Sequence, residues 1–203
     1  MSLEYDYIIA GGGSAGCVLA SRLANKSKDS ICLVEAGGSG KNLFIKMPAG
    51  NGFIFGNPKF DWGYHSVKQA QLNNRKIYFA RGKGLGGTSI VNGMVYIRGV
   101  AQDYDNWRQL GLDGWGYSDL LPYFKYSEGS TNRQNKFHGN QGPLKVEPAR
   151  NFSVLDEAFI KAAVDTGHEF LDDFNANKRA GVSRIDSTTY RGVRQSSAIS
   201  YLK

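Results

Sequence analysis

A glycine-rich turn near the start of the chain constrains the fold more than any other feature. Residues 11–16 read Gly-Gly-Gly-Ser-Ala-Gly and fit the pattern GxGxxG. The turn follows a β-branched and aromatic run at residues 5–10. It precedes an Ala- and Leu-rich stretch of helical spacing at residues 14–24 and a second apolar run at residues 30–35. Strand, turn, helix and strand in this order predict a βαβ unit with a parallel sheet, so we expect an α/β fold.

Each glycine of the turn has a use in binding a dinucleotide. Gly11 permits the tight turn, Gly13 lets the backbone approach a pyrophosphate, and Gly16 lets the helix pack closely on the strand. At the start of the helix, Ser14 and Ala15 offer N–H groups and the positive end of the helix dipole to phosphate oxygens. The plainer interpretation is a turn that only packs a helix against a sheet.

An acidic residue stands where the second strand ends. Glu35 follows the turn at about the 20-residue spacing that is typical of dinucleotide-binding units. A carboxylate at this place accepts hydrogen bonds from the ribose hydroxyls of an adenosine and repels a 2′-phosphate, which argues against NADP. The turn and the acid together fit FAD and NAD equally well.

The composition of the chain disfavours several classes of function. The 203 residues carry a formal net charge of +7, but Lys and Arg are scattered rather than gathered in a stripe, so no nucleic-acid partner is expected. Cys17 and Cys32 have neither CxxC nor Cys/His spacing, so we expect small core residues in a reducing compartment and no metal site. No signal peptide and no run of about 18 apolar residues is found. A cytoplasmic protein is expected, with peripheral association with a membrane left open.

The rest of the chain gives weaker patterns. Residues 36–74 are irregular and rich in Gly, Asn and Pro, which is more typical of a functional loop than of an idle one. Ser118 and Ser153 are predicted helix caps. The remaining predictions are a strand at residues 75–80, a polar loop at 128–143, and helices at 103–110, 118–127 and 153–166.

A second glycine cluster is far more specific than the first. Residues 82–92 read Gly-Lys-Gly-Leu-Gly-Gly-Thr-Ser-Ile-Val-Asn, and Tyr96, Gly99 and Asp105 follow. This stretch resembles the first signature of the glucose–methanol–choline (GMC) oxidoreductase family. Further segments resemble the bacterial choline- and alcohol-dehydrogenase-like branch, so that the resemblance covers the whole chain. They include residues 60–64, 96–99, 103–107, 120–124, 173–175 and 196–198.

The resemblance implies a Rossmann-like FAD-binding domain of GMC type, incomplete here, followed by the beginning of an α+β substrate domain. Residues 1–110 correspond to the FAD-binding domain and residues 111–203 to the start of the substrate-binding region. Small residues in the second cluster let main-chain N–H groups face phosphates and the flavin edge. The full set of expected cofactor-binding residues is Gly11, Gly13, Ser14, Ala15, Gly16, Glu35, Ala36, Arg81, Gly82, Gly86, Gly87, Thr88, Ser89, Asn92, Gly93 and Val95.

The resemblance also bears on how FAD is held. Some members of the family attach FAD covalently through a histidine beside the asparagine of the signature, and this position is Val91 here. Because valine cannot form that bond, noncovalent FAD is expected.

The resemblance implies oxidation of a primary alcohol, choline-like, aliphatic or aryl, by hydride transfer to flavin N5. In the family the base is a histidine near the far C-terminus, and none of His65, His138 and His168 lies in such a motif. His138 and His168 are expected to be solvated or structural. No catalytic residue is therefore assigned, and the chain alone is expected to be inactive without a missing C-terminal half. The alternative is a non-catalytic nucleotide-binding fragment, whereas the second glycine cluster argues against an NAD-dependent dehydrogenase.

Overall fold

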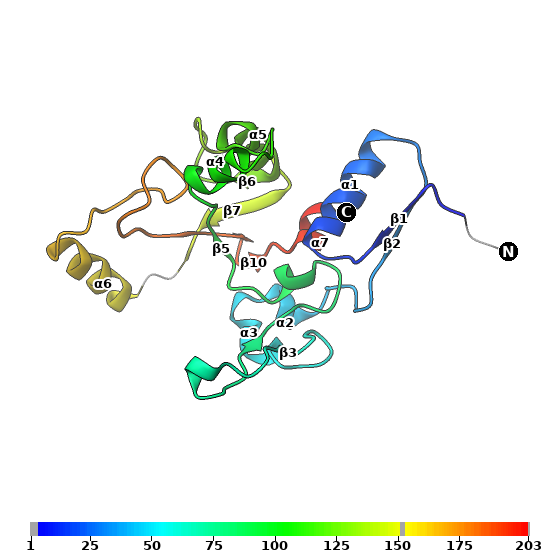
Figure 1. The fold of residues 1–203 in the computed structure, drawn as a ribbon, viewed down its shortest axis with the longest axis horizontal. Coiled ribbons are helices and arrows are strands. Elements are labelled where there is room, and N and C mark those ends of the chain that lie inside the picture. The colour runs from blue at the N-terminus through cyan, green and yellow to red at the C-terminus, as the bar shows by residue number, and fades with distance from the viewer. Residues whose placement is uncertain (1–3, 151–152, 203) are drawn as a thin grey trace. The chain divides into compact units, whose positions relative to one another are not determined.

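The first part of the chain forms the predicted parallel βαβ unit (Figure 1). The computed structural model describes residues 4–150 and 153–202. Strand β1 (Tyr7–Ala10) leads through the glycine turn into helix α1 (Ser14–Lys26), and strand β2 (Ile31–Val34) returns beside β1. The two strands are parallel, with Tyr7 opposite Ile31 and Ala10 opposite Val34. The α/β expectation for this segment is confirmed.

Short elements replace the long irregular stretch that follows β2. The predicted strand at residues 75–80 is reduced to β4 (Tyr78–Phe79), which pairs antiparallel with β3 (Tyr64–His65). Buried Ile45, Ile54, Phe60, Ile90 and Val91 form a core beneath these turns. The helices of this region are α2 (Leu43–Lys46), η1 (Pro48–Gly50), α3 (Asn51–Ile54), η2 (Ala70–Leu72) and η3 (Gly87–Ile90).

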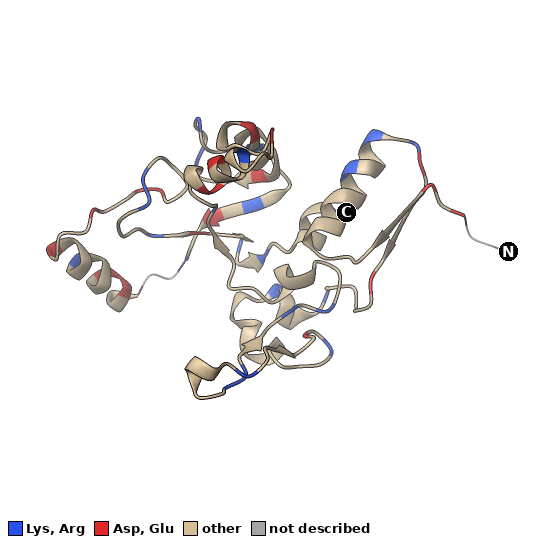
Figure 2. Cartoon of the chain, viewed as in Figure 1, with Lys and Arg blue, Asp and Glu red and all other residues tan. Residues whose placement is uncertain are grey.

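The chain forms two compact units, one of which is discontinuous. Unit 1 comprises Met1–Met94 and Tyr190–Lys203, and unit 2 comprises Val95–Thr189. The sequence predicts a different division, into a cofactor-binding part at residues 1–110 and a substrate-binding part at residues 111–203. That division concerns function rather than compactness, and it stays a prediction. Lys and Arg are spread over both units rather than confined to one element (Figure 2).

The last residues of the chain return to unit 1. Strands β9 (Thr189–Tyr190) and β10 (Val193–Arg194) precede helix α7 (Ser197–Tyr201). Ala198 and Tyr201 of α7 pack with Cys17 of α1 in a second small core. Cys17 is therefore the core residue that the sequence predicts, whereas Cys32 is only half-buried, and both are free thiols.

Unit 2 is built on a four-stranded sheet in the order β5-β8-β7-β6. Strands β6 and β7 are parallel and the other neighbours are antiparallel. The strands are β5 (Val95–Tyr96), β6 (Glu128–Ser130), β7 (Leu144–Pro148) and β8 (Asp186–Ser187), and the helices are α4 (Ala101–Gln109), α5 (Tyr117–Ser127) and α6 (Val154–Asp165).

The helix caps agree with the sequence in one case and differ in another. Ser153 caps α6, because its hydroxyl accepts the Asp156 N–H at 3.3 Å and the Asp156 carboxylate accepts the Ser153 N–H at 2.7 Å. The prediction that Ser118 caps α5 is wrong, since the cap is Gly116. Gly116 N–H donates to the Asp119 carboxylate at 3.1 Å, which satisfies the end of the helix without a serine. Pro122 lies inside α5.

A buried ionic cluster organises unit 2 where the sequence predicts only a polar loop. Glu128, on β6, accepts hydrogen bonds from Arg98 Nη2 at 2.8 Å, from His138 Nδ1 at 2.6 Å and from the Gly139 N–H at 2.9 Å. His138 Nε2 lies 2.8 Å from Asp173 Oδ2. Glu128 and His138 are 0 % and 1 % exposed. His138 is thus structural rather than solvated.

Within the described residues, no helix is long and apolar enough to cross a membrane.

Candidate cofactor site

The first glycine turn has the backbone geometry that its glycines allow. Gly11 adopts φ +100°, in the region that favours glycine, and its N–H donates to the Val34 carbonyl at 2.8 Å. A Cβ on Gly16 would lie 1.9 Å from the Gly11 carbonyl oxygen, so only glycine lets α1 approach the turn this closely. The turn therefore joins β1, α1 and β2 with almost no side-chain bulk.

The N-terminus of α1 is open to an anion. Its cap is Gly13, no side chain accepts from its first amides, and its first turn contains no acid. Ser14 and Ala15 are both exposed. The first N–H groups of a helix carry a partial positive charge and lack partners within the helix, so a phosphate group fits here.

Glu35 faces the same turn from the end of β2. Its carboxylate oxygens accept the N–H of Gly12 at 2.7 Å and the N–H of Gly37 at 2.9 Å. The side chain is half-buried. Each carboxylate oxygen keeps a further lone pair, so the group can still accept hydroxyl donors such as those of a ribose.

The structure brings the two glycine clusters together, although they are far apart in the sequence. The Gly86 N–H donates to the Gly12 carbonyl at 2.7 Å. Gly86 and Gly87 adopt φ +103° and +53°, and a Cβ on Gly87 would lie 2.7 Å from Gly13 Cα. The main chain of Gly86 and Gly87 therefore packs directly on the main chain of Gly12 and Gly13. Backbone groups of both clusters lie beside the open end of α1 as a result.

Residues near the end of the chain support the second cluster from within unit 1. Ser89 Oγ donates to the Gly86 carbonyl at 2.5 Å and accepts the Ser197 N–H at 2.9 Å. Arg194 Nη1 donates to the carbonyl oxygen of Asn92 at 2.6 Å and to its side-chain oxygen at 2.9 Å. Sequence reasoning missed Arg194, although it stands just before residues 196–198, which carry part of the family resemblance.

A buried aspartate fixes the chain that leads into the second cluster. Asp61 Oδ1 accepts the N–H of Gly63 at 2.9 Å and of Arg81 at 3.0 Å, and Oδ2 accepts the Gly56 N–H at 3.0 Å and the Tyr78 hydroxyl. Although burial opposes the charge, these donors hold the pKa of Asp61 down at about 2. Asp61 thereby sets the direction in which residues 81 and 82 enter the site.

The remaining predicted residues differ in their surroundings. Gly82 lies against Gly87, since its Cβ would be 2.1 Å from the Gly87 carbonyl oxygen. Thr88 lies on η3, and Arg81 Nη1 donates to the Ala80 carbonyl at 2.7 Å. Ala36 and Gly93 are exposed. Val95 begins unit 2, and its part in the cofactor site stays a prediction.

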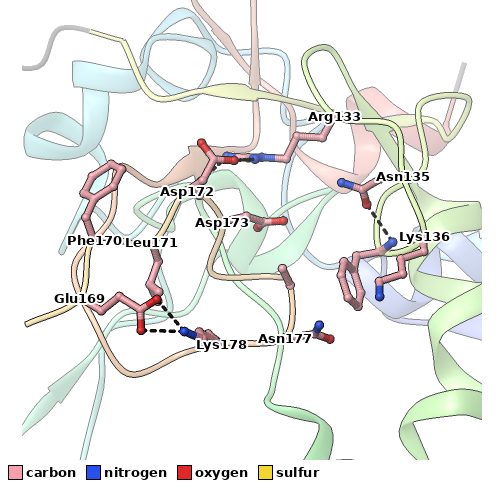
Figure 3. Close-up of a pocket in the computed structure, with 12 residues that line it drawn as sticks. Arg133, Asn135, Lys136, Glu169, Phe170, Leu171, Asp172, Asp173, Asn177 and Lys178 are labelled. Atoms are coloured by element: carbon pink, nitrogen blue, oxygen red, sulfur yellow. Dashed lines mark hydrogen bonds and ion pairs between the residues drawn. The ribbon is translucent and has the colours of Figure 1, made fainter.

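A cavity of about 530 Å³ in unit 2 contains none of the predicted cofactor residues (Figure 3). Several of its charged side chains are engaged with one another or with neighbours. Arg133 binds Asp172 at 2.7 Å, and Lys178 binds Glu169 at 2.7 Å. The meeting of the two glycine clusters, rather than this cavity, is the candidate site.

The residues of this site fit an adenine dinucleotide. An uncapped helix end offers free N–H groups to a diphosphate, the space beside Gly13 is open to within 4.0 Å of a Cβ placed there, and Glu35 offers acceptors for a ribose. Among the described residues, no group of three or more His, Cys, Asp and Glu could hold a metal ion.

Known proteins with similar sequences and structures agree with this description. The GMC oxidoreductase family profile matches residues 5–203. An oxygen-dependent choline dehydrogenase of Sinorhizobium fredii is 44% identical over 99% of this chain, which spans 37% of that protein. The crystal structure of pyridoxine 4-oxidase from Mesorbium loti has a TM-score of 0.92 at 34% identity, over 98% of this chain and 40% of that one. An FAD-dependent oxidoreductase from Chaetomium thermophilum has a TM-score of 0.88 at 31% identity, over 98% and 36%.

These matches confirm the resemblance carried by residues 82–92 and the α/β fold of GMC type. The family profile extends over nearly the whole chain, and the structural matches cover both compact units. The chain belongs to the GMC oxidoreductase family.

Proposed function

We propose that this chain is the FAD-binding part of an enzyme that oxidises a primary alcohol. The observation that carries the proposal is the contact between Gly12–Gly13 and Gly86–Gly87 beside the open end of α1. The names of the relatives, a choline dehydrogenase and a pyridoxine oxidase, support an alcohol as the substrate class. The chain spans 37% of the choline dehydrogenase and 40% of the pyridoxine oxidase, so we assign the activity to a longer protein of which this chain is a part.

Different residues of unit 1 bind different parts of FAD. The amides at Ser14 and Ala15 bind the diphosphate, and Glu35 accepts the adenosine ribose hydroxyls. The second cluster, residues 82–92, lies along the rest of the cofactor together with Gly93, mainly through backbone groups. FAD, when bound, supplies the acceptor at N5 for the hydride that leaves the carbinol carbon.

No described histidine of this chain is suited to remove the hydroxyl proton. His138 is held between Glu128 and Asp173, while His65 and His168 lie exposed without a carboxylate that would orient them as a base. We therefore place the base in sequence beyond this chain. The competing proposal is a nucleotide-binding fragment without catalysis. It has the same nucleotide site and differs only in that no base removes a proton from an alcohol.

A single methyl group at Gly13 tests the site without disturbing the fold. The nearest atom to a Cβ at Gly13 is 4.0 Å away, and its φ of −70° suits alanine. Gly13→Ala in the full-length gene product should change the free energy of unfolding by no more than about 1 kcal/mol. Because the second glycine of this pattern lets the backbone approach the pyrophosphate closely, a methyl group at Gly13 should raise the dissociation constant for FAD at least about tenfold, or about 1.4 kcal/mol.

Fluorescence titration with FAD measures this effect, and Gly52→Ala is the matched control. A Cβ at Gly52 meets no atom within 4 Å, so the site is as open as that of Gly13, but the residue lies on α3 outside the glycine clusters. Equal affinities of Gly13→Ala and Gly52→Ala for FAD would contradict the assignment of the diphosphate to the first glycine turn. Glu35→Ala is a less clean probe, because Glu35 also holds the amides of Gly12 and Gly37.

We also propose that FAD is bound noncovalently. Val91 is 1 % exposed and packs in the core with Ile90, and a valine side chain offers no nucleophile. Acid precipitation of the loaded protein should leave all the flavin absorbance in the supernatant, with free FAD added to apoprotein as the recovery standard. Yellow protein in the washed pellet would contradict the proposal.

A further inference from the structure

Arg194 is a buried cation without an anionic partner. The residue is 0 % exposed, and its guanidinium donates to the Ile45 carbonyl at 2.9 Å, to Asn51 Oδ1 at 2.5 Å and to two oxygens of Asn92. All of these acceptors are neutral, and none of the ion pairs among the described residues includes Arg194. Burial lowers the pKa of Arg194 to about 10, so the group still carries its charge near neutral pH.

Stability alone does not account for such a residue. Desolvating a guanidinium is costly, and an apolar side chain of similar size often serves a protein interior as well or better. Two of the four hydrogen bonds of Arg194 go to one residue, Asn92. We therefore look for the role of Arg194 in how its hydrogen bonds orient Asn92.

The hydrogen bonds of Asn92 fix the orientation of its carboxamide. The side-chain oxygen accepts from Arg194 Nη1 at 2.9 Å and from the Met94 N–H at 3.2 Å. Both partners can only donate, so the reversed amide would set donors against donors. The NH2 group must then point the other way. Asn92 is exposed, and this NH2 has no acceptor among the residues 4–150 and 153–202.

We propose that Arg194 is a positioning residue that locks the Asn92 carboxamide so that its NH2 donates to an acceptor atom of the bound cofactor. The charge of Arg194 draws electron density towards the amide oxygen, which makes the opposite NH2 a stronger donor. The inference rests on the proposed FAD site. It adds a buried residue, remote in sequence, that acts on the cofactor through Asn92.

Two isosteric changes separate this role from simple packing or charge. Asn92→Asp keeps the oxygen that faces Arg194 and Met94 but removes the outward donor. Asn51→Asp places the same new carboxylate beside the same guanidinium and keeps the Asn92 side chain, at the loss of the long 3.4 Å bond from Asn51 Nδ2 to the Asn92 main-chain carbonyl. We expect both variants of the full-length gene product to unfold, without cofactor, at or above the temperature of the wild type. Only Asn92→Asp should weaken FAD binding, at least about tenfold.

A neutral variant and a coupling test complete the experiment. Asn92→Leu also removes the donor, so it should weaken FAD binding, while lowering the unfolding temperature because Arg194 loses two acceptors. Arg194→Met should weaken FAD binding in the wild-type background and have little further effect in the Asn92→Leu background. The visible spectrum of bound flavin should shift with Asn92→Asp and not with Asn51→Asp.

The results distinguish this inference from the proposed function. If the wild-type protein does not bind FAD in the titration, the proposed function itself fails. If the wild type binds FAD, the inference is overturned by equal affinities of Asn92→Asp and Asn51→Asp. It is also overturned if Asn92→Leu binds FAD as the wild type does, or if the Arg194→Met effect persists undiminished in the Asn92→Leu background.

Discussion

Replacing Gly16 by alanine should unfold the first βαβ unit and abolish FAD binding with it. The new Cβ would lie 1.9 Å from the oxygen and 3.1 Å from the carbon of the Gly11 carbonyl. Both atoms belong to main chain that is also held by the bond from Gly11 N–H to Val34, so neither can move aside cheaply. We expect a loss of more than about 4 kcal/mol in the free energy of unfolding.

Thermal unfolding and soluble yield of the full-length gene product measure this loss. Gly13→Ala is the internal control, because it adds the same methyl group to the same turn with no atom closer than 4.0 Å. The two variants should therefore separate folding from binding: Gly16→Ala loses both, whereas Gly13→Ala loses only FAD. A Gly16→Ala protein that unfolds at the wild-type temperature would show that the turn is looser than its geometry implies.

The second large effect is expected at Glu128. Glu128→Ala would leave the charges of Arg98 and His138 buried opposite a missing carboxylate, with side-chain exposures of 4% and 0%. Removing one partner of a buried ion pair typically costs about 3–5 kcal/mol. Glu157→Ala is the matched control: its ion pair with Arg184 is equally short, at 2.6 Å, but half exposed. Such exposed pairs contribute at most about 1 kcal/mol.

The same cluster makes the stability of unit 2 depend on pH. Although burial opposes the charge, Asp173 and Glu128 raise the pKa of His138 to about 9. A pKa raised on folding adds stability that is complete below the unfolded value of about 6.5. This stability is lost as the pH rises through about 9. For Asp173, bonds from His138 and the Asn175 N–H outweigh burial and lower the pKa, so its contribution is lost in acid.

Chemical unfolding between pH 5 and pH 10 therefore should show a decline in stability from about pH 6.5 to pH 9. His138→Gln should lower stability at pH 6 and flatten this part of the profile. A wild-type profile without the decline would mean that His138 is neutral in the folded protein.

The sequence predicted best what local patterns determine. The βαβ unit was predicted to within a few residues, because GxGxxG between two apolar runs has one common structural solution. The cap at Ser153 follows from the acid three residues later. Gly116 was missed as the cap of α5, because a glycine leaves no side chain by which to recognise it.

Contacts between distant residues were beyond sequence reasoning. His138 lay in a polar stretch, and nothing local indicates that Glu128 and Asp173 enclose it. Arg194 was missed for the same reason, since its partners Ile45, Asn51 and Asn92 come from three separate segments. The two glycine clusters were each expected to approach the cofactor, but the contact of Gly86 with Gly12 is visible only in the structure.

The discontinuity of unit 1 has a consequence for its biosynthesis. Both glycine clusters leave the ribosome well before Arg194, Ser197 and α7, yet these later residues hold Asn92, Ser89 and α1 in place. All of unit 2 must be translated in between. Contacts of such long sequence separation form late and slowly, so we expect the nascent chain to expose a half-assembled nucleotide pocket until α7 has been synthesised. We therefore expect the proposed cofactor site to become complete only after unit 2 and α7 have been translated.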